Sequence, residues 1–507
     1  MAGTFLSTAF TAAGTIIITR LLGPDGYGIY TLAFVAPSIF LQFLGLGVTL
    51  AITRYSAFYL SRGEVNRAVQ ITRRGIAFLL LFGVGLALLN LLAAPIVESV
   101  LLKRTNLAPY TAITSIFIMA TAATQAATFA FVGWGSIKLL STFSVLQGVA
   151  RLAIGPPLIL LGLGVYGAVV GHAGSYCVES GATLLTLFAF KLKGSAETGV
   201  SWVDDLRRMI GLGLPAFSGG IASGLAAQYV TILLASVVTN TVIGDYQAAI
   251  NVSVAITLVS SGVTTVLTRS FATLDGLKAD IGPAFDYAVR YVSFLLTPLV
   301  LFLLGSAAAL FNVLYTSFYA GGIILLQLTA LSYLPVTFGL TMLPSFLGGL
   351  GYSRFTMFML VAGAVSVLIT GPILVIWLGL GADGAVLAIL VSNVISTAIG
   401  VFLAVRYLHA QLTIRPLLGI IAAGVASLMA LTLIEQVALP GIPSILLESS
   451  AFTVLYLSLV PLFRGLGFDD LNRLQASIER VRLVGPVMHL ILRYERWVLT
   501  KSGIQAG

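Results

Sequence analysis

Long apolar stretches without charge dominate the chain and set its fold class. The segment from Tyr30 to Thr53 runs 24 residues without a charged side chain, and about 20 apolar residues suffice for a helix to cross a bilayer core. Reading such windows against charged and Gly/Pro breaks predicts fourteen membrane-spanning helices, with twelve as the alternative count. Their approximate ranges are 2–19, 29–52, 75–101, 108–132, 139–161, 165–190, 210–237, 243–267, 288–311, 322–347, 355–379, 384–405, 416–436 and 443–463.

Composition points the same way. Of 507 residues, 58% are hydrophobic and only 9% are charged, and 53 are glycine. Helices satisfy their own backbone hydrogen bonds in lipid, and small residues let them pack closely. We therefore expect an all-α polytopic membrane protein.

The positions of the basic residues predict the topology. Loops after the even-numbered spans, together with the C-terminal tail, hold 23 of the 27 Lys and Arg, whereas the opposite loops hold Arg20, Lys103 and Arg104. By the positive-inside rule, both termini lie in the cytoplasm of a multi-pass protein of the cell membrane. A formal net charge of +9 could suggest nucleic acid, but charges confined to short loops argue against that partner.

An internal repeat predicts the domain organisation. Gly28-Ile29-Tyr30 recurs as Gly244-Asp245-Tyr246, and Arg74 recurs as Arg290, both at a shift of 216 residues. Because this shift covers six helices, the two halves share one orientation, and a cavity between them is expected. The expected parts are a six-helix bundle over 1–200, its repeat over 201–410, two further helices over 411–463, and a basic amphipathic cytoplasmic tail over 464–507.

Motifs for catalysis or cofactor binding are not found. The segment GLGVYGAVV at 162–170 and its match GLGADGAVL at 379–387 contain G-x-G-x-x-G, but each links two predicted membrane helices rather than a strand and a helix, which excludes a dinucleotide site. Cys177 is the single cysteine, so no disulfide forms within the chain. We expect no cofactor, no metal site and no enzyme activity. With no ATP-binding motif, transport would be driven by a gradient.

Charges inside apolar spans are the main candidates for a site, because a charge at mid-bilayer costs several kcal/mol unless it is paired or faces water. Arg151 follows Lys138 by 13 residues, which places it near mid-depth, and Glu179 lies at a similar depth in the next span. His172 shares one helical face with Glu179. These residues are expected to line the cavity, or alternatively to form a buried ion pair that clamps a hairpin. Further cavity candidates, each of which could instead be a topology marker or interhelical glue, are Arg54, Gln42, Gln228 and Asn251.

Several motifs, in order along the chain, resemble a known family. They are RLLGPDGYGIY at 20–30, GLGLPAF at 211–217, GDYQAA at 244–249 and GLGYSRF at 349–355. Together they resemble the polysaccharide flippases (Wzx-like) of the superfamily that also contains MATE and MurJ transporters. One departure is that relatives commonly carry an Asp near Gln228, where this chain has none.

The resemblance implies a function. It implies a secondary transporter that moves a lipid-linked oligosaccharide, on an isoprenoid phosphate or pyrophosphate carrier, from the inner to the outer leaflet by alternating access. The implied partners are that substrate, membrane lipids and a coupling ion, either proton or sodium, with the protein acting as a monomer. One alternative is a cation-coupled multidrug antiporter of the same superfamily, which usually has an acid in its first helix. A membrane glycosyltransferase is less favoured because the outer loops are short.

Overall fold

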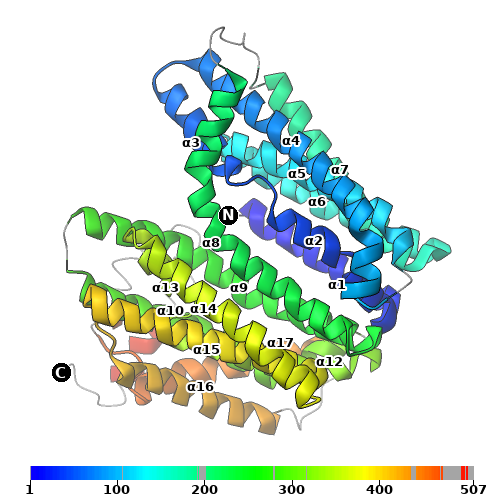
Figure 1. Cartoon of the computed structure of the whole chain (residues 1–507). Coiled ribbons are helices and arrows are strands. Elements are labelled where there is room, and N and C mark those ends of the chain that lie inside the picture. Colours follow the sequence, from blue (N-terminus) through cyan, green and yellow to red (C-terminus); the bar gives the residue numbers. More distant parts are fainter. Residues whose placement is uncertain are drawn as a thin grey trace. The chain divides into compact units, whose positions relative to one another are not determined.

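The computed structural model describes residues 2–104, 107–190, 192, 201–277, 280–315, 317–434, 441–468, 470–471, 493–496 and 498–500. All regular elements of these residues are helices (Figure 1), which confirms the all-α prediction. The chain divides into two compact units, Met1–Gln247 and Ala248–Gly507. The unit boundary falls inside one long helix, α9 (Asn240–Gly276), and the division into bundles at residue 200 stays a prediction.

The first unit contains eight complete helices and the start of α9. Its elements are α1 (Ala2–Ala33), α2 (Val35–Gln42), α3 (Val48–Ser61), α4 (Val65–Ile96) with the π-helical turn η1 (Val97–Leu101), α5 (Ala108–Gly133), α6 (Ile137–Leu158) with the π-helical turn η2 (Ile159–Leu163), α7 (Gly164–Phe190) and α8 (Trp202–Ala235).

The second unit continues from α9. Its elements are α10 (Ile281–Gly305), α11 (Ala307–Leu314), the 3₁₀ turn η3 (Ser317–Tyr319), α12 (Gly321–Ser332), the 3₁₀ turn η4 (Leu334–Phe338), α13 (Leu343–Gly349), α14 (Ser353–Pro372) with the π-helical turn η5 (Ile373–Trp377), α15 (Gly381–Leu408), α16 (Ile414–Ile434) and α17 (Ile442–Leu462).

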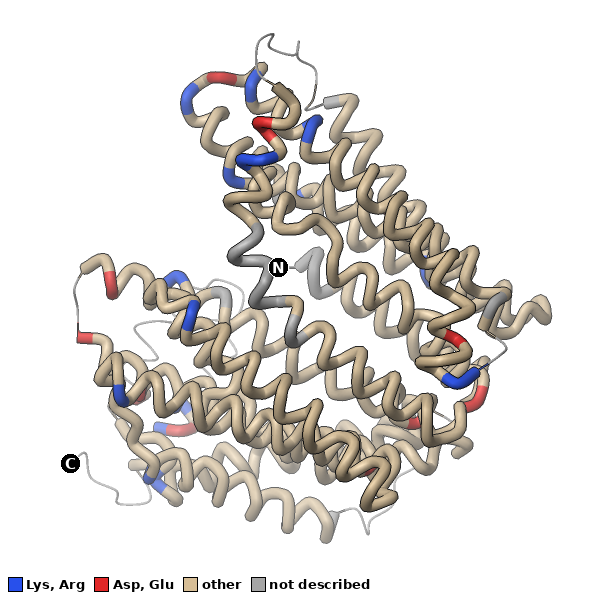
Figure 2. Tube along the Cα trace, viewed as in Figure 1, with Lys and Arg blue, Asp and Glu red and all other residues tan. Residues whose placement is uncertain are grey.

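Eleven segments of the described chain are long and apolar enough to cross a membrane. Two of them exceed one crossing: Leu6–Gln42 has 37 residues and Lys138–Ala189 has 52. The first is broken at Gly23 and the second between α6 and α7. Dividing both at these breaks and adding α8 accounts for the fourteen crossings expected from the sequence. Figure 2 shows that few charged residues lie along the long helices.

The G-x-G-x-x-G motifs form hairpin turns between helices. Gly162 and Gly164 adopt positive φ values of 91° and 51° between α6 and α7, and the repeat-related Gly379 and Gly381 adopt 67° and 54° before α15. A side chain at the third glycine, Gly167, would lie 2.9 Å from the backbone of Leu158. The glycines therefore serve turn geometry and close packing, as the rejection of a dinucleotide site predicted.

A symmetric glycine contact joins α1 to the start of α9. A Cβ atom at Gly28 would lie 1.9 Å from the carbonyl oxygen of Asn240, and one at Gly244 would lie 2.0 Å from that of Pro24. Both Gly28 and Gly244, and Pro24 and Asn240, are related by the 216-residue shift. The repeat seen in the sequence thus reappears as a contact in which backbone touches backbone.

The predicted amphipathic tail lies mostly outside the described residues. Of the segment from Arg464 onward, the structure describes 464–468, 470–471, 493–496 and 498–500. Within them, Leu471 and Leu499 join the buried cluster formed by α10, α16 and α17, and Tyr494 bonds Ser458 of α17 across 2.7 Å. These parts of the tail pack against the second unit.

Candidate functional site in the first unit

Close packing of α6 on α7 positions the candidate site. A Cβ atom at Gly171 of α7 would lie 2.3 Å from the Cα atom of Gly155 of α6, so the two backbones touch at this crossing. Arg151 lies one helical turn before Gly155, and His172 directly follows Gly171. The small residues therefore bring the arginine of one predicted span beside the histidine of the next.

Tyr30 of α1 links these two side chains. Arg151 donates from Nη2 to the Tyr30 hydroxyl oxygen at 3.2 Å, and the same hydroxyl lies 2.6 Å from Nδ1 of His172. Because an arginine only donates, the tyrosine oxygen accepts from Arg151 and its proton is left for His172. The Nδ1 atom is then an acceptor, which describes a neutral imidazole.

Aromatic rings enclose the histidine. His172 stacks on Tyr176, with ring centroids 5.5 Å apart and planes 9° apart. Phe34 lies 4.4 Å from the imidazole centroid, and Phe117 meets it edge-on at 5.1 Å. Tyr30 and Phe34 also contact each other at 5.2 Å. The polar centre is thus held between ring faces contributed by four helices.

Arg151 has donor capacity that the described protein does not use. The side chain is 8% exposed, and its Nε atom is buried without a hydrogen-bond partner. The ion pair expected with Glu179 does not form among the described residues, where Arg151 bonds Tyr30 instead. Glu179 is also 8% exposed and lies two turns after His172 on α7. The cluster therefore has an unpartnered, buried, cationic N–H group.

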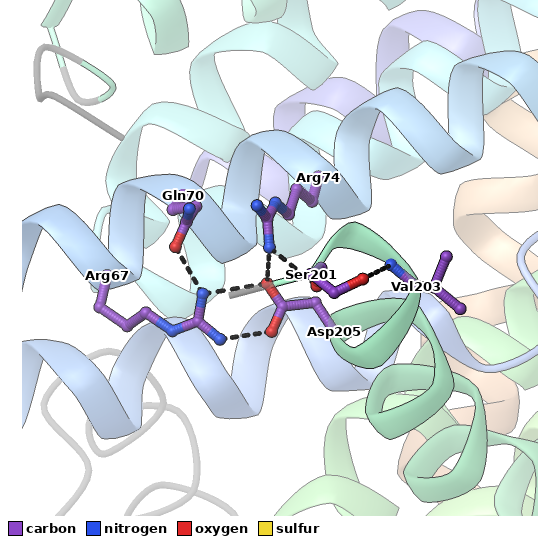
Figure 3. A network of polar contacts seen from close by, with 6 residues as sticks. All are labelled: Arg67, Gln70, Arg74, Ser201, Val203 and Asp205. Atoms are coloured by element: carbon purple, nitrogen blue, oxygen red, sulfur yellow. Dashed lines mark hydrogen bonds and ion pairs between the residues drawn. The ribbon is translucent and has the colours of Figure 1, made fainter. Parts of the chain in front are cut away.

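A second polar network of the first unit fixes the start of α8 against α4 (Figure 3). Arg67 donates to both carboxylate oxygens of Asp205, including Nη1 to Oδ2 at 3.0 Å, and Arg74 forms an ion pair with the same carboxylate. Arg74 also donates to the carbonyl of Ser201 at 3.2 Å, and Gln70 accepts from Arg67. Asp205 is fully buried. One carboxylate therefore anchors the beginning of α8 to two arginines.

The second unit contains an apolar groove of about 930 Å³. Leu334 and Phe338 of η4 line it on one side, and Val394 and Val401 of α15 on the other, and Arg406 lies at the end of α15 that the groove reaches. Its width and lining suit an alkyl chain.

Comparison with known proteins identifies the family. A family described as "Polysaccharide biosynthesis protein" matches residues 17–324, more than half of the chain. The chain belongs to this family. The resemblance stated from the sequence motifs is thereby confirmed. No curated protein matches this polysaccharide biosynthesis protein in sequence.

Solved structures share its fold. A lipid II flippase MurJ in an inward closed conformation matches with a TM-score of 0.73 and 14% identity over 91% of this chain and 98% of that one. A multidrug resistance MATE transporter of the MOP superfamily, inward-facing, matches at 0.67 and 17% identity over 78% and 92%. A MOP superfamily transporter from Pyrococcus furiosus, titled for the reverse polarity of its binding pocket, matches at 0.58 and 17% over 79% and 92%.

The other predicted site residues of this polysaccharide biosynthesis protein lie apart from the Arg151 cluster. Gln42 ends α2 and packs against Gly224 of α8. Gln228 is partly buried on α8, and Arg54 is exposed on α3. Asn251 belongs to α9 in the second unit. Their role as cavity residues stays a prediction.

The sequence analysis missed two parts of the site. Tyr30 was read only as part of a motif and as the start of an apolar span, although it makes the central hydrogen bonds. The position of this hydroxyl-bearing residue in the repeated Gly-x-Tyr motif was the available signal. Asp205, which organises the second network, carried no signal in the sequence.

Proposed function

We propose that this protein is a secondary transporter that flips a lipid-linked oligosaccharide, carried on an isoprenoid phosphate or pyrophosphate, from the inner to the outer leaflet of the cell membrane. The observation that carries the proposal is the buried Arg151 with an unpartnered Nε atom. The family match and the shared fold with a lipid II flippase support it.

The chemistry of the cluster suits an anionic substrate. A phosphate accepts charge-assisted hydrogen bonds from a guanidinium through two parallel N–H groups, whereas the Tyr30 hydroxyl accepts only one from Arg151. A phosphate is therefore the better partner and displaces Tyr30. The same cation repels an organic cation, which disfavours the multidrug antiporter alternative at this site.

Other features suit the remaining parts of such a substrate. The rings of Phe34, Phe117 and Tyr176 offer flat apolar faces on which sugar rings can stack. The apolar groove of the second unit has room for an alkyl chain. In this proposal the isoprenoid stays in lipid-facing grooves while the charged head enters the protein.

Alternating access of two repeats supplies the movement. Both termini lie in the cytoplasm, and the protein acts as a monomer of two six-helix bundles, 1–200 and 201–410, followed by two further helices. A proton or sodium gradient drives the cycle. Phosphate binding frees Arg151 from Tyr30, and Glu179, buried on the same helix as His172, is a carboxylate available to a coupling proton.

Flipping in sealed proteoliposomes tests the proposal. The substrate is a fluorescent short-chain oligosaccharide on a polyprenyl pyrophosphate, and its accessibility to an outside reagent reports flipping. Arg151→Lys keeps the charge but loses the planar fork, so binding should weaken at least about tenfold. Arg151→Met combined with Glu179→Gln should abolish flipping while the protein still expresses and inserts.

The matched control is Lys138→Met, which removes an exposed positive charge from the same helix and should leave flipping intact. Normal flipping by the double variant Arg151→Met/Glu179→Gln would remove this cluster from the mechanism. A requirement for ATP without dependence on any gradient would overturn the secondary mechanism.

A further inference from the structure

A small polar pocket lies in the first unit where α4 ends. It has a volume of about 20 Å³, and a space of roughly 10–15 Å³ by this measure holds one water molecule. Asn90 of α4, Glu98 of the π-helical turn η1, and Thr111 and Thr114 of α5 line it. The pocket is separate from the Arg151 cluster and belongs to no part of the proposed substrate path.

The hydrogen bonds around the pocket fix the orientation of the Asn90 amide. Thr114 and Ser115 both donate their hydroxyl protons to the carbonyl of Thr111, at 3.2 and 2.9 Å. Their oxygens are therefore left as acceptors, and the Asn90 Nδ2 atom donates to Ser115 at 2.8 Å and to Thr114 at 3.4 Å. The amide oxygen is left over: Asn90 Oδ1 is buried without a partner, in a residue that is 0% exposed.

The remaining groups are also acceptors. Thr111 donates its hydroxyl proton to Glu98 Oε1 at 3.0 Å, so its oxygen has free lone pairs. Glu98 is a carboxylate that is 8% exposed. A buried amide oxygen without a partner costs about 1–3 kcal/mol. The pocket therefore calls for an occupant that is electropositive and about as large as a water molecule.

We propose that this pocket binds a single monovalent metal cation, Na⁺. Its lining is made of hard oxygen donors, and it carries one carboxylate, which balances one positive charge. Divalent Ca²⁺ and Mg²⁺ sites use more carboxylates or phosphates. The small volume favours Na⁺ over the larger K⁺.

The local backbone adds to this preference. The pocket lies at the C-terminal end of α4, where helix carbonyls carry partial negative charge. The helix widens there into η1, and π-helical turns often occur at functional sites. Broken helix ends and their carbonyls are a known way for membrane transporters to coordinate Na⁺.

Thermal unfolding of the purified full-length protein in detergent tests the proposal without any substrate, so the result is independent of the flipping assay. Tm is measured while NaCl replaces choline chloride at constant ionic strength, with a parallel KCl series. A Tm that rises with Na⁺ and saturates, with little response to K⁺, is expected. Glu98→Gln and Asn90→Leu should each shift the midpoint Na⁺ concentration upward by at least about tenfold.

The matched control is Glu448→Gln on α17. Glu448 is 2% exposed and also has a buried, unpartnered carboxylate oxygen, but it does not line the pocket, so the Na⁺ response should be unchanged. If Glu98→Gln does not fold, Thr111→Val removes one hydroxyl with little change in shape and should weaken the response in the same direction.

Two outcomes overturn the proposal. Equal Tm values in sodium and choline for the unaltered protein mean that the pocket holds water only. A Na⁺ response that persists at the same midpoint in the pocket variants places the cation elsewhere. Titration calorimetry with NaCl on the same samples checks the stoichiometry, which should be one.

Discussion

Removing the carboxylate of Asp205 should undo the anchor of α8. Asp205→Asn keeps the shape of the side chain but leaves Arg67, which is 5% exposed, without its counter-charge. Arg74 loses an ion pair as well, although its side chain is 19% exposed and water compensates it in part. The effect should therefore come mainly from Arg67.

The magnitude follows from the burial of the pair. Breaking a buried ion pair by removing one partner costs about 3–5 kcal/mol, because the other charge stays buried and uncompensated. Asp205 also lies in the first turn of α8, where a negative charge adds about 0.3–1 kcal/mol through the helix dipole. The sum is a large fraction of the stability of a typical domain.

The neighbouring Asp204 offers a matched control. It lies in the same first turn but is exposed, so Asp204→Asn should lose only the dipole contribution. Tm from fluorescence-detected size exclusion compares the two variants, and Asp205→Asn combined with Arg67→Met should recover part of the loss. Equal Tm values for Asp204→Asn and Asp205→Asn would refute the reasoning.

Two further predictions concern packing and pH. Gly171→Ala should destabilise the protein by about 1–3 kcal/mol, because its Cβ would lie 2.3 Å from Gly155, whereas Gly181→Ala, which meets nothing within 4 Å on the same helix, should be neutral or stabilising by thermal unfolding. Burial raises the pKa of Glu495 from 4.5 to about 8. Because the undocked carboxyl ionises first, docking of residues 493–496 should be strongest at low pH and weaken as pH rises from about 4.5 to about 8. Hydrogen exchange of this segment measures it, Glu495→Gln should remove the pH dependence, and protection that is constant across that range would contradict the prediction.

The fold could be predicted because it depends on signals that lie along the chain. Uncharged runs give the spans, and paired glycines such as Gly162 and Gly164 give the hairpins, since only local geometry is involved. The charge of Arg151 in an apolar span pointed to the site for the same reason. A charge at that depth is costly wherever it faces.

The partners of these charges could not be predicted. The position of Arg151 along its helix gave its depth but not its direction, so the expected ion pair with Glu179 was not formed and Tyr30 took its place. Arg67 looked like one more topology marker, because Asp205 lies 138 residues away in sequence. Such pairs depend on how helices pack, which no local pattern encodes.

The backbone contact between α1 and α9 has a mechanical consequence. α1 bends at Gly23, whose φ of 66° suits glycine alone, and Tyr30 lies on the short arm beyond this hinge. The same arm presses against Asn240 and Gly244 of α9 without any side chain between them. A push on α9, whose later turns belong to the second unit, is therefore transmitted stiffly to Tyr30. α9 acts as the rod and Gly23 as the pivot of a lever that lifts the tyrosine from Arg151.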